Sequence, residues 1–166
     1  RRLTTAVKTP DGAAYVLNGK KLWTTNGTLA KLLVVMAMDP DTKKISAFVV
    51  EADWPGVSVE HRCRFMGLRA ISNAVMDFKD VRVPAGNLIG QEGEGYKIAL
   101  GALEGGRIGI GAQSVGMARS ALEVAIAYAK ERESFGTTLI NHQAVAFRLA
   151  ECATRLEAAR QLIWHA

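Results

Sequence analysis

The hydrophobic pattern changes its period near residue 92, and this change limits the folds open to the chain. Before it, short apolar or alternating runs are separated by turn-forming residues, which is typical of β structure. After the glycine-rich connector 88–95, apolar residues recur at the spacing of an α-helix. The sequence therefore predicts an α+β fold with a β domain at 1–92 and a helical domain at 93–166.

The first half contains seven strand-like runs. Asn18-Gly19 lies between the first two, and Asn-Gly tolerates positive φ at both positions, so it predicts a tight type I′ hairpin. Several short strands at this spacing predict an antiparallel barrel or sandwich. The runs are 14–17, 21–25, 32–38, 45–51, 57–62, 74–78 and 81–83.

The second half predicts a short helix at 96–103, a long helix from 107 to about 132 and a third from about 142 to 166. Helices of this kind cannot cover one another's apolar faces as a four-helix bundle does. We therefore expect the sequence to be a fragment. The apolar stripe of the third helix is Val145, Leu149, Cys152, Leu156, Ala159 and Ile163.

The net charge of +5 could attract an anionic partner, but the Lys and Arg residues are dispersed along the chain. No nucleic-acid motif organises them, so nucleic acid is not an expected partner. The longest apolar run, 32–38, is too short to cross a bilayer, and no transmembrane segment or secretory leader is expected. The two cysteines have no metal-type spacing, which favours free thiols in a reducing compartment.

Four motifs could carry chemistry, and each also has an ordinary structural explanation. Glycines at 106, 109 and 111 resemble a dinucleotide fingerprint, but they enter a helix without a preceding strand, which excludes that reading. Trp23 beside Thr25 could form an apolar wall with a hydroxyl for a planar heterocycle, or be a core Trp. Glu104 and Arg107 could meet an anionic ligand or form a local salt bridge.

The fourth motif is the segment 132–136 followed by His142 and Gln143. Arg132 with a hydroxyl and an aromatic residue could hold a phosphate or an adenine. The alternative is a helix C-terminus, in which Gly136 ends the helix and Phe135 packs below it.

Taken together and in order, these segments resemble the acyl-CoA dehydrogenase family, from about residue 15 to the last residue. Any one marker is weak, whereas the ordered set is highly specific. The markers are YVLNGKKLWTTNG at 15–27, FMGLR at 65–69, VRVP at 81–84, NLIG at 87–90, GR at 106–107, and RESFG at 132–136 with HQ at 142–143.

The resemblance implies an antiparallel β-barrel domain followed by part of an up-and-down helical bundle. It implies FAD as cofactor, with Trp23 and Thr25 meeting the flavin ring and other residues binding FAD across a subunit interface. Thr24 and Ser134 depart mildly from the usual motifs. The residues implied across the interface are Arg132, Ser134, Phe135, His142 and Gln143, and those near the thioester are Glu104 and Arg107.

The activity implied is α,β-dehydrogenation of an acyl-CoA thioester, as in fatty acid β-oxidation. The general base is a Glu that this chain is not expected to contain, because Gly106 occupies the position used in one branch and most members carry it later. An acyl-CoA oxidase, a flavin monooxygenase or a non-catalytic binding module remain alternatives. The resemblance also implies an electron-transfer flavoprotein as acceptor, a homodimer or homotetramer, and a bacterial cytoplasm or mitochondrial matrix.

Overall fold

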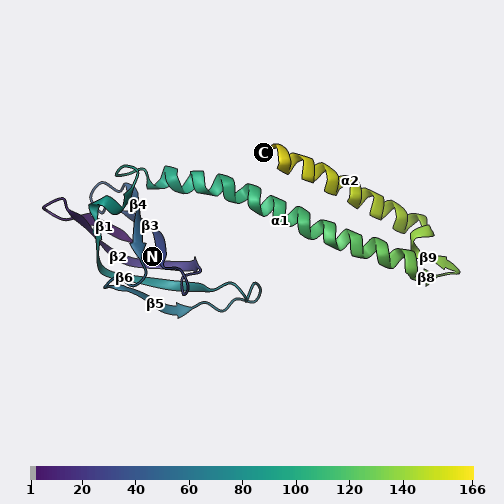
Figure 1. The fold of residues 1–166 in the computed structure, drawn as a ribbon, viewed down its shortest axis with the longest axis horizontal. Helices are drawn as coiled ribbons and strands as arrows, with labels where there is room; N and C mark the ends of the chain where they lie inside the picture. Colours follow the sequence, from purple (N-terminus) through teal and green to yellow (C-terminus); the bar gives the residue numbers. More distant parts are fainter. Residues whose placement is uncertain (1–2) are drawn as a thin grey trace. The chain divides into compact units, whose positions relative to one another are not determined.

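The computed structural model describes residues 3–166, which fall into two compact units divided between Leu100 and Gly101. We call residues 3–100 the β unit and residues 101–166 the helical unit. Figure 1 traces the chain from the strands of the β unit into two long helices. The expected α+β fold is confirmed, whereas the domain boundary after residue 92 stays a prediction.

Seven strands of the β unit form one sheet in the order β5-β6-β2-β1-β3-β4-β7. The strands expected at 32–38, 45–51 and 57–62 are confirmed as β3, β4 and β5. All neighbours are antiparallel except β1 and β3, so the sheet is mixed rather than purely antiparallel. The strands are β1 (Thr5–Lys8), β2 (Ala14–Thr25), β3 (Leu32–Met38), β4 (Ile45–Glu51), β5 (Val57–Arg62), β6 (Asn73–Pro84) and β7 (Leu88–Ile89).

One hydrophobic core holds this sheet together. The rings of Tyr15 on β2 and Phe48 on β4 are 4.9 Å apart, although two strands separate β2 from β4 in the sheet. Such a contact requires the sheet to curl around a shared interior. The largest fully buried side chains are Phe48, Leu17, Met76, Val50, Val81 and Val83.

The hairpin predicted at Asn18-Gly19 is wrong, because β2 runs without interruption from Ala14 to Thr25. The extra residue is absorbed as a bulge against β6 between Leu17 and Gly19. Gly19 has φ +136, and a Cβ there would lie 2.7 Å from the Cα of Thr4. The Asn18 amide binds Asp80 instead of closing a turn. Pairing with strands distant in sequence has overridden the local turn preference.

The runs 74–78 and 81–83 are likewise one strand, β6, rather than two. Asp80 has φ 51, and its amide N–H donates to the Asn18 side chain at 2.9 Å, so the bend is stabilised without breaking the strand. The short strands β1 and β7 were not predicted. Both lack a long apolar run. β1 pairs with β2, the next strand along the chain, whereas β7 pairs with the distant strand β4.

The helical unit consists mainly of α1 (Gly95–Glu131) and α2 (Gln143–His165). The helices expected at 96–103 and from 107 are a single helix, because the glycines between them cost less than helix continuation gains. The third predicted helix is confirmed as α2. The two helices pack against each other, since a Cβ on Gly111 would lie 2.4 Å from Cδ1 of Ile163. None of the helices among residues 3–166 has the length and apolarity that crossing a bilayer requires.

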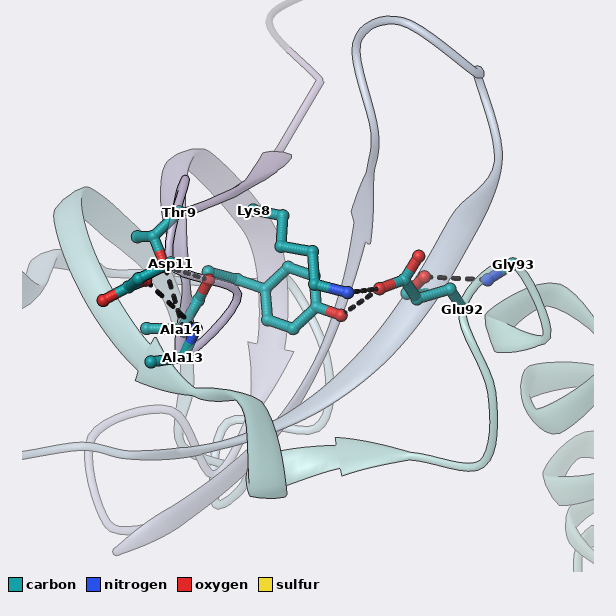
Figure 2. Close-up of polar contacts among 9 residues, drawn as sticks. Lys8, Thr9, Asp11, Ala13, Ala14, Glu92 and Gly93 are labelled. Atoms are coloured by element: carbon teal, nitrogen blue, oxygen red, sulfur yellow. Dashed lines mark hydrogen bonds and ion pairs between the residues drawn. The ribbon is translucent and has the colours of Figure 1, made fainter.

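Hydrogen bonds from both side chain and backbone fix the connector before α1 to the β unit (Figure 2). The Glu92 carboxylate accepts hydrogen bonds from Lys8 Nζ at 2.7 Å and from the Tyr15 hydroxyl. The Gly93 amide donates to Ser46 Oγ at 2.9 Å. A Cβ on Gly95 would lie 2.7 Å from the carbonyl carbon of Ser46, so the helix must begin with glycine where it passes β4.

Candidate functional site

Trp23 lies outside the strand ladder and at the surface. The register of β2 against β6 shifts between Lys21 and Thr24, which leaves Trp23 in a bulge with φ 55. A bulky residue at positive φ is an outlier that the surrounding structure must enforce. The side chain is 65% exposed, so the strain does not serve core packing, and the expectation of a core Trp is wrong.

Thr25 anchors the far side of this bulge. Its Oγ1 donates to Asn73 Oδ1 at 3.0 Å, and the two residues are register partners in β2 and β6. On the near side, the Lys21 ammonium donates to the Met36 carbonyl on β3. Burial lowers the pKa of Lys21, because the charged form loses solvent. The chain is therefore anchored by a side-chain hydrogen bond on each side of Trp23.

The strand that carries Trp23 has one open edge. β1 pairs with β2 only as far as Asn18, so within residues 3–166 the segment from Gly19 to Thr25 is paired with β6 alone. A slot of about 380 Å³ lies between this edge and β3. It is lined by apolar side chains with the polar groups of Lys21, Thr24 and Thr25 among them. Apolar walls with a few placed polar groups are typical of ligand sites.

The segment after α1 is a β-hairpin. Strands β8 (Glu133–Ser134) and β9 (Thr137–Thr138) pair, and Phe135 and Gly136 form the turn with φ 50 and φ 79. Positive φ at both central residues defines a type I′ turn. Phe135 is 98% exposed at the tip, so the alternative in which it packs below a helix end is wrong.

Hydrogen bonds fold this hairpin back onto the start of α2. The Leu139 amide donates to the Arg132 carbonyl at 2.8 Å. His142 Nε2 lies 3.0 Å from the Ser134 carbonyl oxygen, and its ring meets Phe135 edge-on with centroids 6.4 Å apart. We call the segment 132–143 the elbow. It brings together every residue that the sequence placed in this motif: Arg132, Ser134, Phe135, His142 and Gln143.

The elbow offers a cation as well as an aromatic ring. Arg132 and Gln143 are exposed, and among residues 3–166 no carboxylate forms an ion pair with the Arg132 guanidinium. A free guanidinium beside an exposed ring matches the chemistry of a phosphate attached to a heterocycle. The elbow belongs to the helical unit and the Trp23 bulge to the β unit.

Glu104 and Arg107 lie on the exposed surface of α1. They do not form the local salt bridge considered above, since within residues 3–166 no ion pair joins them. Both charges therefore remain available to a ligand.

Two residues that hold these features were not found from the sequence. Asn73 accepts the hydrogen bond of Thr25, and Asn141 donates to the hydroxyls of Thr137 and Thr138 at 2.9 and 3.1 Å. Asn141 lies in η2 (Leu139–Asn141), the 3-10 turn before α2. An Asn just before a helical run is a usable signal, because its amide satisfies local turns. Asn73 has no such signal, since its partner is distant in sequence.

Sequence comparison identifies both parts of the chain. Residues 1–81 match the acyl-CoA dehydrogenase middle domain, and residues 93–166 match the acyl-CoA dehydrogenase C-terminal domain. An acyl-CoA dehydrogenase of Bacillus subtilis is 44% identical over 166 residues, which is 98% of this chain and 43% of that protein. The chain belongs to the acyl-CoA dehydrogenase family. It spans less than half the length of this relative.

Solved structures agree with this assignment. Butyryl-CoA dehydrogenase from Megasphaera elsdenii matches with a TM-score of 0.91 and 41% identity, covering 98% of this chain and 43% of that one. An acyl-CoA dehydrogenase complexed with FAD from Bacillus anthracis matches with a TM-score of 0.87 and 35% identity, covering 97% of this chain and 28% of that one.

Proposed function

We propose that the protein takes part in FAD-dependent α,β-dehydrogenation of acyl-CoA thioesters. The observation that carries the proposal is that Trp23 and Phe135, at family positions for FAD, are both exposed and both held at positive φ. Strained, exposed aromatic residues are expected where a ligand covers them. The family and the FAD-bound relative support this cofactor.

The residues of the β unit would bind the flavin ring. The Trp23 indole supplies a flat apolar wall, and the Thr25 hydroxyl supplies a polar group whose direction is fixed by Asn73. When bound, FAD supplies the hydride acceptor. These residues orient the ring and exclude water from one face.

The elbow would bind the remainder of the cofactor. Arg132 offers its guanidinium to a phosphate, while Ser134, Phe135, His142 and Gln143 form the surrounding surface. In our proposal this elbow serves the cofactor of a neighbouring subunit in a homodimer or homotetramer. The exposure of Phe135 at the tip of the type I′ turn supports this proposal, since a residue that contacts another subunit must be accessible.

The thioester would lie along α1, beside Glu104 and Arg107. Hydrogen bonds to the thioester carbonyl make the α proton acidic enough for a carboxylate to remove it. We assign no general base within this chain, because Gly106 occupies the position used in one branch of the family and Glu104 lies two residues before it. The proposed electron acceptor is an electron-transfer flavoprotein, in a bacterial cytoplasm or a mitochondrial matrix.

The test is anaerobic flavin bleaching. The test uses the FAD-loaded full-length protein, because the segment 1–166 alone lacks a general base and is not expected to turn over. This protein is mixed with a series of acyl-CoA thioesters, and the loss of flavin absorbance is followed by stopped flow. Trp23→Leu should slow bleaching by about ten-fold or more, because a misplaced ring loses alignment with the substrate. Trp164→Leu is the matched control, since Trp164 is 69% exposed on α2 and belongs to neither the Trp23 bulge nor the elbow.

If no thioester bleaches the flavin of the full-length protein, with FAD demonstrably bound, the proposed reaction is contradicted. Rapid reoxidation of the reduced protein by oxygen would identify an oxidase or monooxygenase on the same scaffold instead. Equal rates in Trp23→Leu and Trp164→Leu would remove Trp23 from the site.

A further inference from the structure

The loop that joins β5 to β6 concentrates positive charge. It carries Arg62, Arg64 and Arg69 and contains no Asp or Glu between residues 62 and 71. All three arginines line a single hollow of about 520 Å³, together with Cys63, Phe65, Leu68 and Ile71. The dispersed pattern of basic residues elsewhere in the chain makes this convergence distinctive.

The three guanidinium groups lack acidic partners within residues 3–166. No ion pair joins any of them to a carboxylate. Arg69 Nε donates to the Phe65 carbonyl at 3.3 Å, which fixes the loop but does not neutralise charge. Like charges that converge without a counter-ion favour binding of an anionic partner.

The same loop exposes apolar side chains at its tip. Met66 is fully exposed and Leu68 is 75% exposed, although Leu68 is held at φ 51. Leu68 thus has a strained backbone although its exposed side chain takes no part in core packing. Arg and Met are enriched at protein–protein interfaces, whereas a small anion has no use for Met66 and Leu68 at the tip.

The loop is continuous with the strands that hold Trp23. The Cys63 amide donates to the Asn73 carbonyl at 2.8 Å, and the Asn73 side chain accepts the hydrogen bond of Thr25. A partner docked on the loop would therefore lie beside the strand end that we assign to the flavin ring. Proximity of this kind is what electron transfer between two proteins requires.

We propose that loop 62–71 is the docking surface for an electron-accepting protein that presents carboxylates around an apolar patch. The inference rests on the proposed function. In the proposed reaction the thioester would lose a proton to the general base and a hydride to FAD. The electron pair would then pass to the redox group of the docked protein, which is reduced while FAD is reoxidised. The arginines steer the acceptor by charge, and Met66 and Leu68 supply the apolar centre of the contact.

The test compares two acceptors of the FAD-loaded protein: an electron-transfer flavoprotein purified from the same organism, and a small ferrocenium dye that needs no docking. The readout is the ratio of the flavoprotein-linked to the dye-linked rate. In the triple variant Arg62→Glu, Arg64→Glu, Arg69→Glu, this ratio should fall about ten-fold or more, with a raised KM for the flavoprotein. The flavoprotein-linked rate should also depend less strongly on salt concentration in the same variant.

Lys79→Glu is the matched control, because Lys79 is also an exposed cation of the β unit but lies outside the loop. Leu68→Gly is a second variant, which removes the exposed side chain and the strained φ together. It should lower the ratio without lowering stability, so loss of fold cannot account for the effect.

An unchanged ratio and salt dependence in the triple variant would overturn the proposal. So would an equal fall in Lys79→Glu, which would mean that net charge alone matters. Binding of inorganic phosphate at the loop, with no change in the flavoprotein-linked rate, would identify a small-anion site instead. Failure of the thioester to reduce the flavin would be seen with both acceptors, and would count against the proposed function rather than the docking surface.

Discussion

The β unit and the helical unit bury their apolar side chains to very different extents. In the β unit, Phe48, Leu17 and Val50 are inaccessible to solvent within a single core. In residues 101–166, all of which the structure describes, Ala129 is the one buried side chain. Ile110, Val124, Phe147, Leu162 and other large apolar residues of α1 and α2 lie at the surface.

The β unit is stabilised by its own core, whereas the helical unit exposes apolar surface that suits contact with another part of a protein. Burial of apolar surface contributes about 25 cal/mol per Å², so the β unit gains most of its stability internally. The two helices leave a groove lined by Val115, Leu122 and Leu156 on their facing sides. Contiguous exposed apolar surface of this kind marks an interaction site. The proposed FAD contacts of the elbow lie on the helical unit, which buries less apolar surface.

The largest expected effect separates the two units directly. Phe48→Ala should destabilise the β unit by about 3–5 kcal/mol, because it leaves a cavity in a close-packed core. Leu162→Ala should change stability by less than about 0.5 kcal/mol, since Leu162 is 72% exposed. Hydrogen exchange measured peptide by peptide reports each unit separately. Similar losses of protection in the two variants would contradict the comparison.

Glycine substitutions should have opposite signs in the two units. Gly56 has φ +89, and a Cβ there would lie 2.1 Å from the Lys79 carbonyl oxygen, so Gly56→Ala should cost about 1–3 kcal/mol. Gly109 lies on α1 with open space where its Cβ would be, so Gly109→Ala should gain up to about 1 kcal/mol. Urea denaturation of both variants checks the signs. A stabilising Gly56→Ala would show that the turn between β4 and β5 is less constrained than the structure indicates.

A smaller, pH-dependent effect is expected where the connector binds the β unit. Hydrogen bonds from Lys8 and then Tyr15 hold the pKa of Glu92 below its usual value of 4.5. A carboxyl whose pKa is depressed on folding contributes stability above its unfolded pKa, and that stability is lost as the pH falls through the folded pKa. Because the pair is half exposed, Glu92→Gln should cost less than about 1 kcal/mol at pH 7.

The cost of Glu92→Gln should begin to shrink as the pH falls below about 4.5, and it should disappear once the pH passes below the lower pKa of the folded state. Thermal melts of the wild type and the variant across this pH range give the difference. Lys20 and Glu60 form a comparable exposed pair at 2.8 Å, so Glu60→Gln is a control for general charge effects. A difference between wild type and Glu92→Gln that persists at low pH would show that the carboxylate charge is not its source.

Two tight turns show how far the sequence could predict the fold. Asn18-Gly19 carries the stronger local signal for a type I′ turn, yet it forms a bulge within β2 because Thr5 of β1 and β6 pair across it. Phe135-Gly136 reads as a helix stop, yet it forms the type I′ turn. Local preferences are worth about 1 kcal/mol, and pairing with distant strands outweighs them.

Prediction was more successful where the apolar pattern was long and continuous. Strands β3 and β4 and helix α2 were placed correctly, because an unbroken period identifies such elements. The site residues could be named only as an ordered set of motifs. Their exposure and positive φ could not be predicted, since a Trp or Phe in an isolated motif is as well suited to a core as to a ligand. The convergence of Arg62, Arg64 and Arg69 on one hollow depends on the loop fold and was also out of reach.

The central claim is that Trp23 is exposed in the polypeptide because FAD covers it. With Trp54→Phe and Trp164→Phe as background, Trp23 is the one remaining indole in the sequence, and its fluorescence can be followed while FAD is added. We expect strong quenching that saturates with FAD binding and a loss of acrylamide access to the indole. Binding of FAD that leaves both the fluorescence and the acrylamide access of Trp23 unchanged would contradict the account.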